Sequence, residues 1–394
     1  MPYVTRSRDQ HLSNDGLPKR ILALDGGGLR GILSLAILQR IETILRERHG
    51  NAAEFRLCHY FDLVAGTSTG AIIAATIALG WTVERIREKY MELGTRVFEK
   101  TFFRQGVLRA KYDESSLIAE LQKVFGTDTT LGSDAIKTGL LVVTKRIDTG
   151  SWWPISNNPR GTYFAVRAGG TIGNGEYPLW QVVRASTAAP SFFDPETITI
   201  ASRPDAKPVV GEFVDGGVSP FNNPALMAFM YATIEGYRIG WPKGADKLFL
   251  VSVGTGASDP SIKRSSIAAK GALDALLSLM EDCASLQETL LQWMSSSRTA
   301  RQIDRELGDL RQDLVGDVPA LNYLRYNVDL RAESVQALDP TPPEVGKIAS
   351  LSAMDAPENM SYLHKLGVLA AAHDVQAADF TAGFDLPKVA AVGT

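Results

Sequence analysis

Residues 61–79 read FDLVAGTSTGAIIAATIAL, and this stretch decides the expected architecture. The apolar run Phe61 to Ala65 predicts a buried strand, and Ala71 to Leu79 predicts a buried helix. Between them, Gly66-Thr67-Ser68-Thr69-Gly70 fits the pattern G-x-S-x-G, in which a serine occupies a sharp turn between strand and helix. The two glycines of this elbow remove Cβ atoms that would collide there. The sequence therefore predicts Ser68 as a nucleophile at a helix N-terminus, where the helix dipole stabilises negative charge.

The same region resembles a membrane span in one respect, because no charged residue occurs from Leu63 to Val83. That length is about what a transmembrane helix needs. However, the glycines, threonines and serine of its first half are too polar and too flexible for a span. A buried strand, a tight turn and a buried helix explain the pattern better.

A similar strand, loop and helix precede this unit. Ile21 to Leu24 is a short apolar run that ends in a glycine loop, and apolar residues recur at helical spacing from Leu33 to Leu45. Further apolar runs predict strands at Leu140–Val143, Phe213–Val214 and Leu248–Val253. Apolar strands that alternate with helices are typical of an α/β fold with a mostly parallel central sheet covered on both faces.

The chain changes character after Gly254-Thr255-Gly256, because residues 258–266 are polar and include Pro260. We expect three parts: a polar N-terminal segment (1–18), an α/β domain (19–257) and a mainly helical C-terminal extension (258–394). Within the extension, the pattern predicts long amphipathic helices over 268–314, an irregular proline-rich segment over 331–360 and a short helix over 362–377.

Composition excludes several classes of protein. With 41 basic and 44 acidic residues the net charge is −3, so we expect no basic surface for a nucleic-acid polymer. Two cysteines, Cys58 and Cys283, cannot form a disulfide framework or a zinc cluster, which favours a reducing compartment. Residues 1–20 contain no apolar segment typical of a secretion signal, and the last residues carry no anchor motif. These features predict a cytoplasmic location.

The glycine loop Asp25-Gly26-Gly27-Gly28-Leu29-Arg30-Gly31 admits two interpretations. It satisfies G-x-G-x-x-G, the dinucleotide-binding fingerprint, and it follows a strand and opens a helix. That fingerprint also requires an acidic residue about 20 positions later, at the end of a second strand. Here Glu42 and Glu47 both lie in the expected helix. Consecutive N–H groups at a helix start bind an oxyanion instead. Arg30 adds a positive charge beside the loop, unless it forms only a surface salt bridge.

The third motif, Asp215-Gly216-Gly217, follows a short apolar strand, so Asp215 is expected at the carboxyl edge of the sheet, where ligands collect. Alone, an Asp-Gly pair more often marks a turn. A histidine base is the alternative, but in an α/β-hydrolase the histidine follows the acid. Only His364 and His373 do so, in a helical tail without a motif; the other histidines are His11, His49 and His59. The three motifs together predict a serine hydrolase in which Asp215 itself takes the proton.

In order and spacing, these three motifs resemble those of the patatin-like phospholipases. Ala185-Ser186-Thr187-Ala188-Ala189-Pro190, followed by Phe192-Phe193, is similar to the family's block between serine and aspartate. Gly254-Thr255-Gly256 is similar to the family's last turn. The resemblance spans about Lys19 to Gly256 and does not cover the final third of the chain.

The resemblance implies a three-layer α/β/α fold and a Ser–Asp dyad without histidine, with Ser68 as nucleophile and Asp215 as general base. The implied oxyanion hole comprises Arg30 and the amides of Gly26, Gly27 and Gly28. The implied reaction is hydrolysis of acyl esters in phospholipids or related lipids through an acyl-enzyme. The chain would then be a serine carboxylic-ester hydrolase of the phospholipase A1 or A2 type, with no metal and no cofactor.

Two aromatic clusters raise the question of membrane contact. One lies between Ile147 and Trp180 and includes Trp152 and Trp153, and the other comprises Phe98, Phe102 and Phe103. Aromatic residues beside Lys and Arg suit a lipid–water interface, and ordinary core packing explains them equally well. We expect an acyl-ester lipid substrate and transient, peripheral contact with a membrane surface.

The tail after Ser266 fits a lid, an oligomerisation surface or the docking site of a regulator. Some bacterial members of the resembled family are secreted toxins, and others are defence effectors switched on by cyclic nucleotides. The apparent lack of a signal peptide fits the second group, so a small-molecule activator and a homo-oligomer are both open. Two other functions also stay open: a storage protein with residual esterase activity, and a nucleotide-binding module that uses the Gly26–Gly31 loop.

Overall fold

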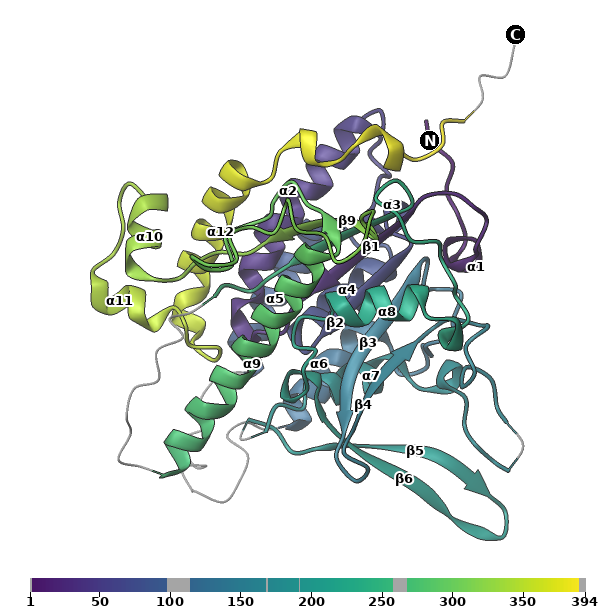
Figure 1. Cartoon of the computed structure of the whole chain (residues 1–394). Helices are drawn as coiled ribbons and strands as arrows, with labels where there is room; N and C mark the ends of the chain where they lie inside the picture. Colours follow the sequence, from purple (N-terminus) through teal and green to yellow (C-terminus); the bar gives the residue numbers. More distant parts are fainter. Residues whose placement is uncertain (1, 98–113, 168, 191, 258–267, 390–394) are drawn as a thin grey trace.

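The computed structural model describes residues 2–97, 114–167, 169–190, 192–257 and 268–389. Nine strands of these ranges form one sheet, in the order β5-β6-β3-β2-β1-β7-β9-β8, with β4 beside β3 (Figure 1). The strands are β1 (Lys19–Leu24), β2 (Leu63–Thr67), β3 (Gly139–Arg146), β4 (Ser151–Ser156), β5 (Glu196–Arg203), β6 (Ala206–Asp215), β7 (Leu248–Val253), β8 (Ser295–Ser296) and β9 (Leu321–Tyr326).

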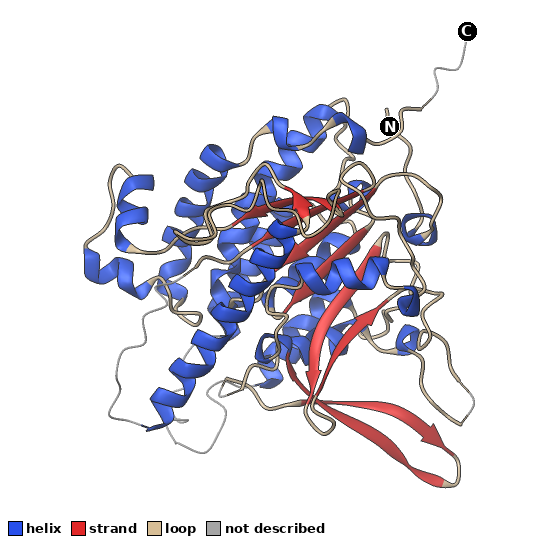
Figure 2. Ribbon diagram, in the orientation of Figure 1, coloured by secondary structure: helices blue, strands red, loops and turns tan. Residues whose placement is uncertain are grey.

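Helices cover both faces of the sheet (Figure 2). Side chains alternate along a strand, so Leu22 and Leu24 of β1 enter one apolar core and Ile21 and Ala23 enter the other. The first core is closed by α2 (Gly31–Arg48), α4 (Thr69–Ala78), α5 (Val83–Val97), α6 (Glu114–Phe125), α7 (Leu179–Ser186) and α12 (Met360–Asp374). The second is closed by α8 (Ala225–Thr233) and α9 (Ala268–Trp293). Short helices are α1 (Arg8–Leu12), α3 (Leu57–Tyr60), α10 (Ala332–Leu338) and α11 (Val345–Ser350).

The topology brings the ends of β2 and β6 together. β2 runs parallel to β3 and its last pair is Thr67 with Val143, whereas β6 runs antiparallel to β3 and its last pair is Asp215 with Thr144. β4 occupies the other edge of β3, since it pairs with the whole range from Leu141 to Arg146. β2 and β6 therefore lie on the same edge of β3 and meet head to head. This arrangement alone places the residue after Thr67 beside Asp215.

The expected α/β fold with a mostly parallel central sheet is confirmed, since five of the eight strand pairings in the described chain are parallel. Residues 63–78 form strand, turn and helix, as predicted. No helix within the described ranges combines the length and apolar character needed to span a bilayer.

The C-terminal extension differs from its predicted pattern. β9 joins the central sheet beside β7, although no strand was expected there. α9 ends at Trp293 rather than near Leu314, and α10 and α11 lie within the segment expected to be irregular. β9 escaped prediction because its sequence, LNYLRY, contains two polar residues and no continuous apolar run.

Candidate active site

Ser68 occupies the turn between β2 and α4, with φ 55° and ψ −126°. A positive φ is costly for a residue with a Cβ, so the surrounding contacts must hold it. A Cβ on Gly66 would lie 2.2 Å from the carbonyl oxygen of Gly70, and a Cβ on Gly70 would lie 2.1 Å from that of Leu24. Both predicted elbow glycines therefore stand where only glycine fits.

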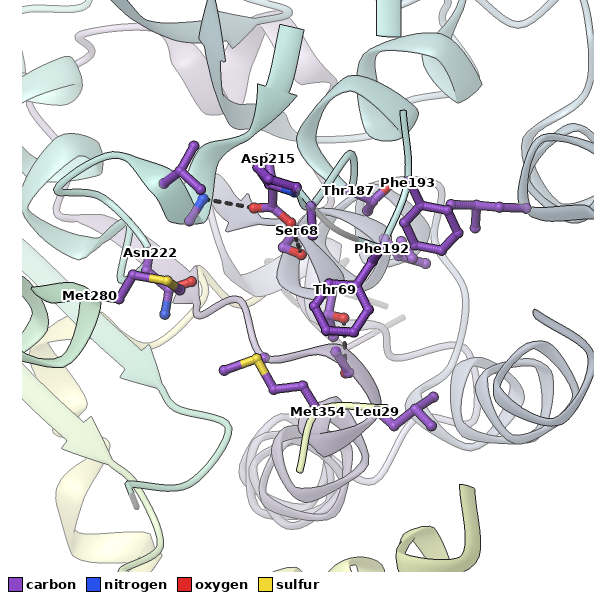
Figure 3. Close-up of a pocket in the computed structure, with 18 of the residues that line it drawn as sticks. Leu29, Ser68, Thr69, Thr187, Phe192, Phe193, Asp215, Asn222, Met280 and Met354 are labelled. Carbon is purple, nitrogen blue, oxygen red and sulfur yellow. Dashed lines mark hydrogen bonds between the residues drawn. The ribbon is translucent and has the colours of Figure 1, made fainter. Parts of the chain in front are cut away.

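Asp215 follows at the end of β6, directly beside this turn (Figure 3). The Ser68 hydroxyl donates a hydrogen bond of 2.5 Å to Oδ2 of Asp215, and the Gly217 amide donates one of 2.7 Å to Oδ1. Burial of the carboxyl raises the pKa of Asp215 to about 6, against the opposite effect of these two hydrogen bonds. The carboxylate is thus a stronger base than an ordinary aspartate, and it contacts the hydroxyl that it would deprotonate.

Ser186, the last residue of α7, holds the strained turn. Its hydroxyl accepts a hydrogen bond of 2.8 Å from the Ser68 amide and donates one of 2.6 Å to the carbonyl of Val143. The hydroxyl is fully buried, and it links the nucleophile's backbone to the central strand β3. The sequence singled out the block around Ser186 without indicating this role.

The glycine loop offers two free amides to the site. A trans peptide points its N–H and C=O in opposite directions, so holding one fixes the other. The carbonyl of Gly26 accepts from the Thr255 hydroxyl at 2.9 Å, and the carbonyl of Gly27 accepts from the Arg30 amide at 3.2 Å. In the described chain no hydrogen bond engages the amides of Gly27 and Gly28, and both residues line the pocket that contains Ser68.

Two residues predicted for the oxyanion hole are not available to it. The Gly26 amide already donates to the carbonyl of Asn222 at 3.1 Å. Arg30 is buried outside the pocket lining, where its charge is attracted by Glu281 and Asp25, and burial lowers the pKa of its guanidinium. The loop geometry therefore narrows the predicted hole to Gly27 and Gly28.

The pocket around the dyad is small and apolar, with a volume of about 110 Å³. Its walls include Phe192 and Phe193, and Met280 of α9 and Met354 line the opposite side (Figure 3). The Met354 carbonyl accepts a hydrogen bond of 2.7 Å from the Leu29 amide, which ties the C-terminal extension to the glycine loop. Pockets for drug-sized ligands occupy about 300–1,000 Å³, so this pocket does not enclose a whole phospholipid.

The histidines lie elsewhere, since the described lining includes none of them. His11 bonds Asp62, His49 bonds backbone groups of Leu45 and Leu386, and His59 bonds Tyr3. His373 is exposed beside Asp374, and burial lowers the pKa of the half-buried His364. Within the described ranges, no cluster of three or more acidic, histidine or cysteine side chains could hold a metal ion.

This chain is similar in sequence to a known protein family and to several bacterial proteins. The model of the patatin-like phospholipase family matches residues 22–229. A cGAMP-activated phospholipase of Vibrio cholerae serotype O1 is 26% identical over 66% of this chain and 70% of its own length. A cUMP-AMP-activated phospholipase of Escherichia coli is 33% identical over 55% of this chain and 59% of its own length. Among solved structures, human GIVD cytosolic phospholipase A2 aligns with 93% of this chain and 59% of its own, at 12% identity and a TM-score of 0.46. Because the family model covers more than half of the sequence, this chain belongs to the patatin-like phospholipases.

Proposed function

We propose that the chain is a lipid acyl hydrolase of the phospholipase A type that works through a Ser68–Asp215 dyad. The observation that carries the proposal is the 2.5 Å hydrogen bond between these two side chains, in a pocket with two free amides. Oxyanion donors of this kind contribute about 3 kcal/mol each to the stabilisation of an acyl-transfer transition state.

The mechanism has two halves. Ser68 Oγ attacks the ester carbonyl while Oδ2 of Asp215 takes its proton, and the amides of Gly27 and Gly28 stabilise the oxyanion. Asp215 then returns the proton to the departing alcohol, the lysophospholipid, which leaves an acyl-enzyme on Ser68. A water molecule, deprotonated by Asp215, attacks this ester, and its collapse releases the fatty acid and restores the serine.

The reaction is tested with phosphatidylcholine liposomes that carry different acyl chains at the two glycerol positions. We expect equal amounts of free fatty acid and lysophospholipid, which mass spectrometry of the products will identify. The chain released first distinguishes A1 from A2 cleavage. Release of phosphate, diacylglycerol or free headgroup instead would contradict acyl hydrolysis.

The rate should depend on the ionisation of Asp215. The carboxylate form is the base, and the pKa of Asp215 is about 6, so protonation removes the base as the pH falls. We expect kcat/KM to level off above about pH 7 and to fall about tenfold per unit below pH 6. A rate that stays constant between pH 7 and pH 4.5, in protein that remains folded by circular dichroism, would argue against Asp215 as the base.

We further propose that activity is controlled by a small ligand at a membrane surface. The dyad pocket does not enclose a whole phospholipid, and Met280 of α9 and Met354 line its side opposite the two phenylalanines. The two bacterial relatives are named for activation by cyclic dinucleotides. On this proposal a cyclic dinucleotide shifts the chain to an arrangement in which α9 and the segment around Met354 uncover the dyad to a bilayer.

A further inference from the structure

A second cavity, of about 670 Å³, shares no lining residue with the dyad pocket. Its walls come from β4, from the β5–β6 hairpin, from the loop between residues 157 and 178, and from the short helix η4 (Glu235–Tyr237). This volume lies within the range of about 300–1,000 Å³ that small-molecule sites occupy.

The cavity is rich in aromatic rings. Seven of its lining residues are aromatic, and they include both tryptophans of the sequence cluster, Trp152 and Trp153. Trp152 is 46% exposed and Tyr163 is 61% exposed, so both side chains have surface that a ligand can contact. Exposed aromatic faces around a cavity favour a planar ring that can stack between them.

The polar groups of the cavity are neutral, and some of them have no hydrogen-bond partner among the described residues. None of its described lining residues is charged. The side chains of Thr162, Thr171 and Asn174 enter no hydrogen bond within the described part of the chain, so they offer donors and acceptors to the edge of a ring. The side-chain amide of Asn174 has a donor next to an acceptor, so it can pair with the edge of a nucleobase, which presents the same combination.

Arginine side chains lie beside two of the rings, and their positive charge favours an anionic ligand over a cationic one. The guanidinium of Arg146 lies 5.1 Å from the Trp153 ring, and that of Arg167 lies 5.4 Å from the Tyr163 ring. A cationic headgroup such as choline would have to compete with these side chains. Arg146 is paired with Asp148, whereas Arg167 is exposed and forms no ion pair with a described residue. Arg167 does not line the cavity itself, but it lies against the Tyr163 ring and is free to meet a phosphate bound beside that ring.

We propose that this cavity binds a cyclic dinucleotide, with a base stacked among the aromatic rings and a phosphate near Arg167. The inference gives a location to the ligand control in the proposed function and rests on it. A lipid surface could also supply an anionic ligand and contact Trp152. The experiment below distinguishes that possibility from a cyclic dinucleotide.

Packing connects the cavity with the dyad. The ring of Trp152 lies 5.5 Å from that of Phe221, whose carbonyl accepts a hydrogen bond of 2.7 Å from Thr67, the neighbour of Ser68. The ring of Trp153 lies 5.2 Å from that of Phe213, two residues before Asp215. A ligand that reorients the two tryptophans thus acts on the backbone beside both catalytic residues.

Binding is tested by calorimetric titration of the full chain with cGAMP and with cUMP-AMP. The Ser68→Ala variant serves as the parent, so the result does not depend on hydrolysis. Since base stacking contributes about 1–3 kcal/mol, we expect Tyr163→Ala to weaken binding about 5- to 150-fold. Asn174→Ala should also weaken binding, because it removes a hydrogen-bonding partner of the base. Trp293→Ala, at a similarly exposed aromatic residue outside the cavity, should bind like the parent.

Several outcomes overturn the proposal. One is that neither nucleotide binds, and another is that the cavity variants bind as tightly as the parent. A third is that Trp152→Ala abolishes liposome flotation while nucleotides have no effect, which assigns the cavity to a membrane surface. If nucleotides bind but the wild-type chain releases no fatty acid from liposomes, the cavity assignment stands and the hydrolase proposal fails.

Discussion

Replacing Ser68 by alanine or Asp215 by asparagine is expected to reduce fatty-acid release by about 10⁴-fold or more, because each change removes one half of a two-residue centre. Asparagine keeps the shape of Asp215 but cannot accept the serine proton. The carboxyl is buried and bonded to Ser68 and to the Gly217 amide, so the loss should appear in kcat rather than KM. Initial rates on fluorogenic acyl esters and on liposomes measure the effect.

Matched histidine variants provide the control for the dyad. His364→Ala and His373→Ala follow Asp215 in the chain, as the histidine of a triad would, but neither residue lines the pocket. Both variants should retain wild-type turnover within about twofold. Loss of turnover in either variant, with an unchanged melting temperature, would indicate a triad that includes that histidine.

Ser186→Ala is expected to lower kcat by about 10- to 100-fold, although Ser186 contacts no reacting atom. The change leaves the Ser68 amide and the Val143 carbonyl without their shared partner. The strained turn at Ser68 then relaxes, and a displacement of about 1 Å at a nucleophile can cost about 100-fold. Each buried group left unpaired also destabilises the fold by about 1–3 kcal/mol, which urea unfolding measures.

Further measurements distinguish a role of Ser186 in positioning Ser68 from a role in stabilising the fold. KM should stay unchanged, because the pocket walls remain. The pH midpoint should stay near 6 or rise, because a displaced Ser68 weakens a hydrogen bond that lowers the pKa of Asp215. Ser186→Thr, which keeps the hydroxyl, should recover most of the lost kcat. If threonine matches alanine in kcat although it restores the unfolding free energy, Ser186 stabilises the fold without positioning the nucleophile.

Local patterns predict the strands of the core and the turn at Ser68 well, because each depends on neighbours in sequence. The elbow at Ser68 needs two glycines, a preceding strand and a following helix, and all four are adjacent in the chain. Asp215 follows an apolar run at a sheet edge. What local pattern could not show is that β2 and β6 meet on one edge of β3, since that depends on the pairing of distant strands.

The parts that escaped prediction depend on long-range contacts. Thr255 orients the Gly26–Gly27 peptide from 229 positions away. Arg325 of β9 forms a buried, two-pronged ion pair with Asp25 at the start of the glycine loop, and Met354 binds the Leu29 amide. The extension from residue 268 onward therefore completes the site. The cluster of Phe98, Phe102 and Phe103 lies outside the described residues.

The central claim is that Ser68 is a nucleophile activated by Asp215 alone. A fluorophosphonate forms a stable bond with an activated serine, and peptide mass spectrometry locates the modified residue. The measurement is made with and without cGAMP and cUMP-AMP, because we propose that such a ligand uncovers the dyad. The account predicts labelling at Ser68 in the wild type and in both histidine variants, and at least about 100-fold slower labelling in Asp215→Asn. Labelling of a different serine, or undiminished labelling of Ser68 in Asp215→Asn, would contradict it.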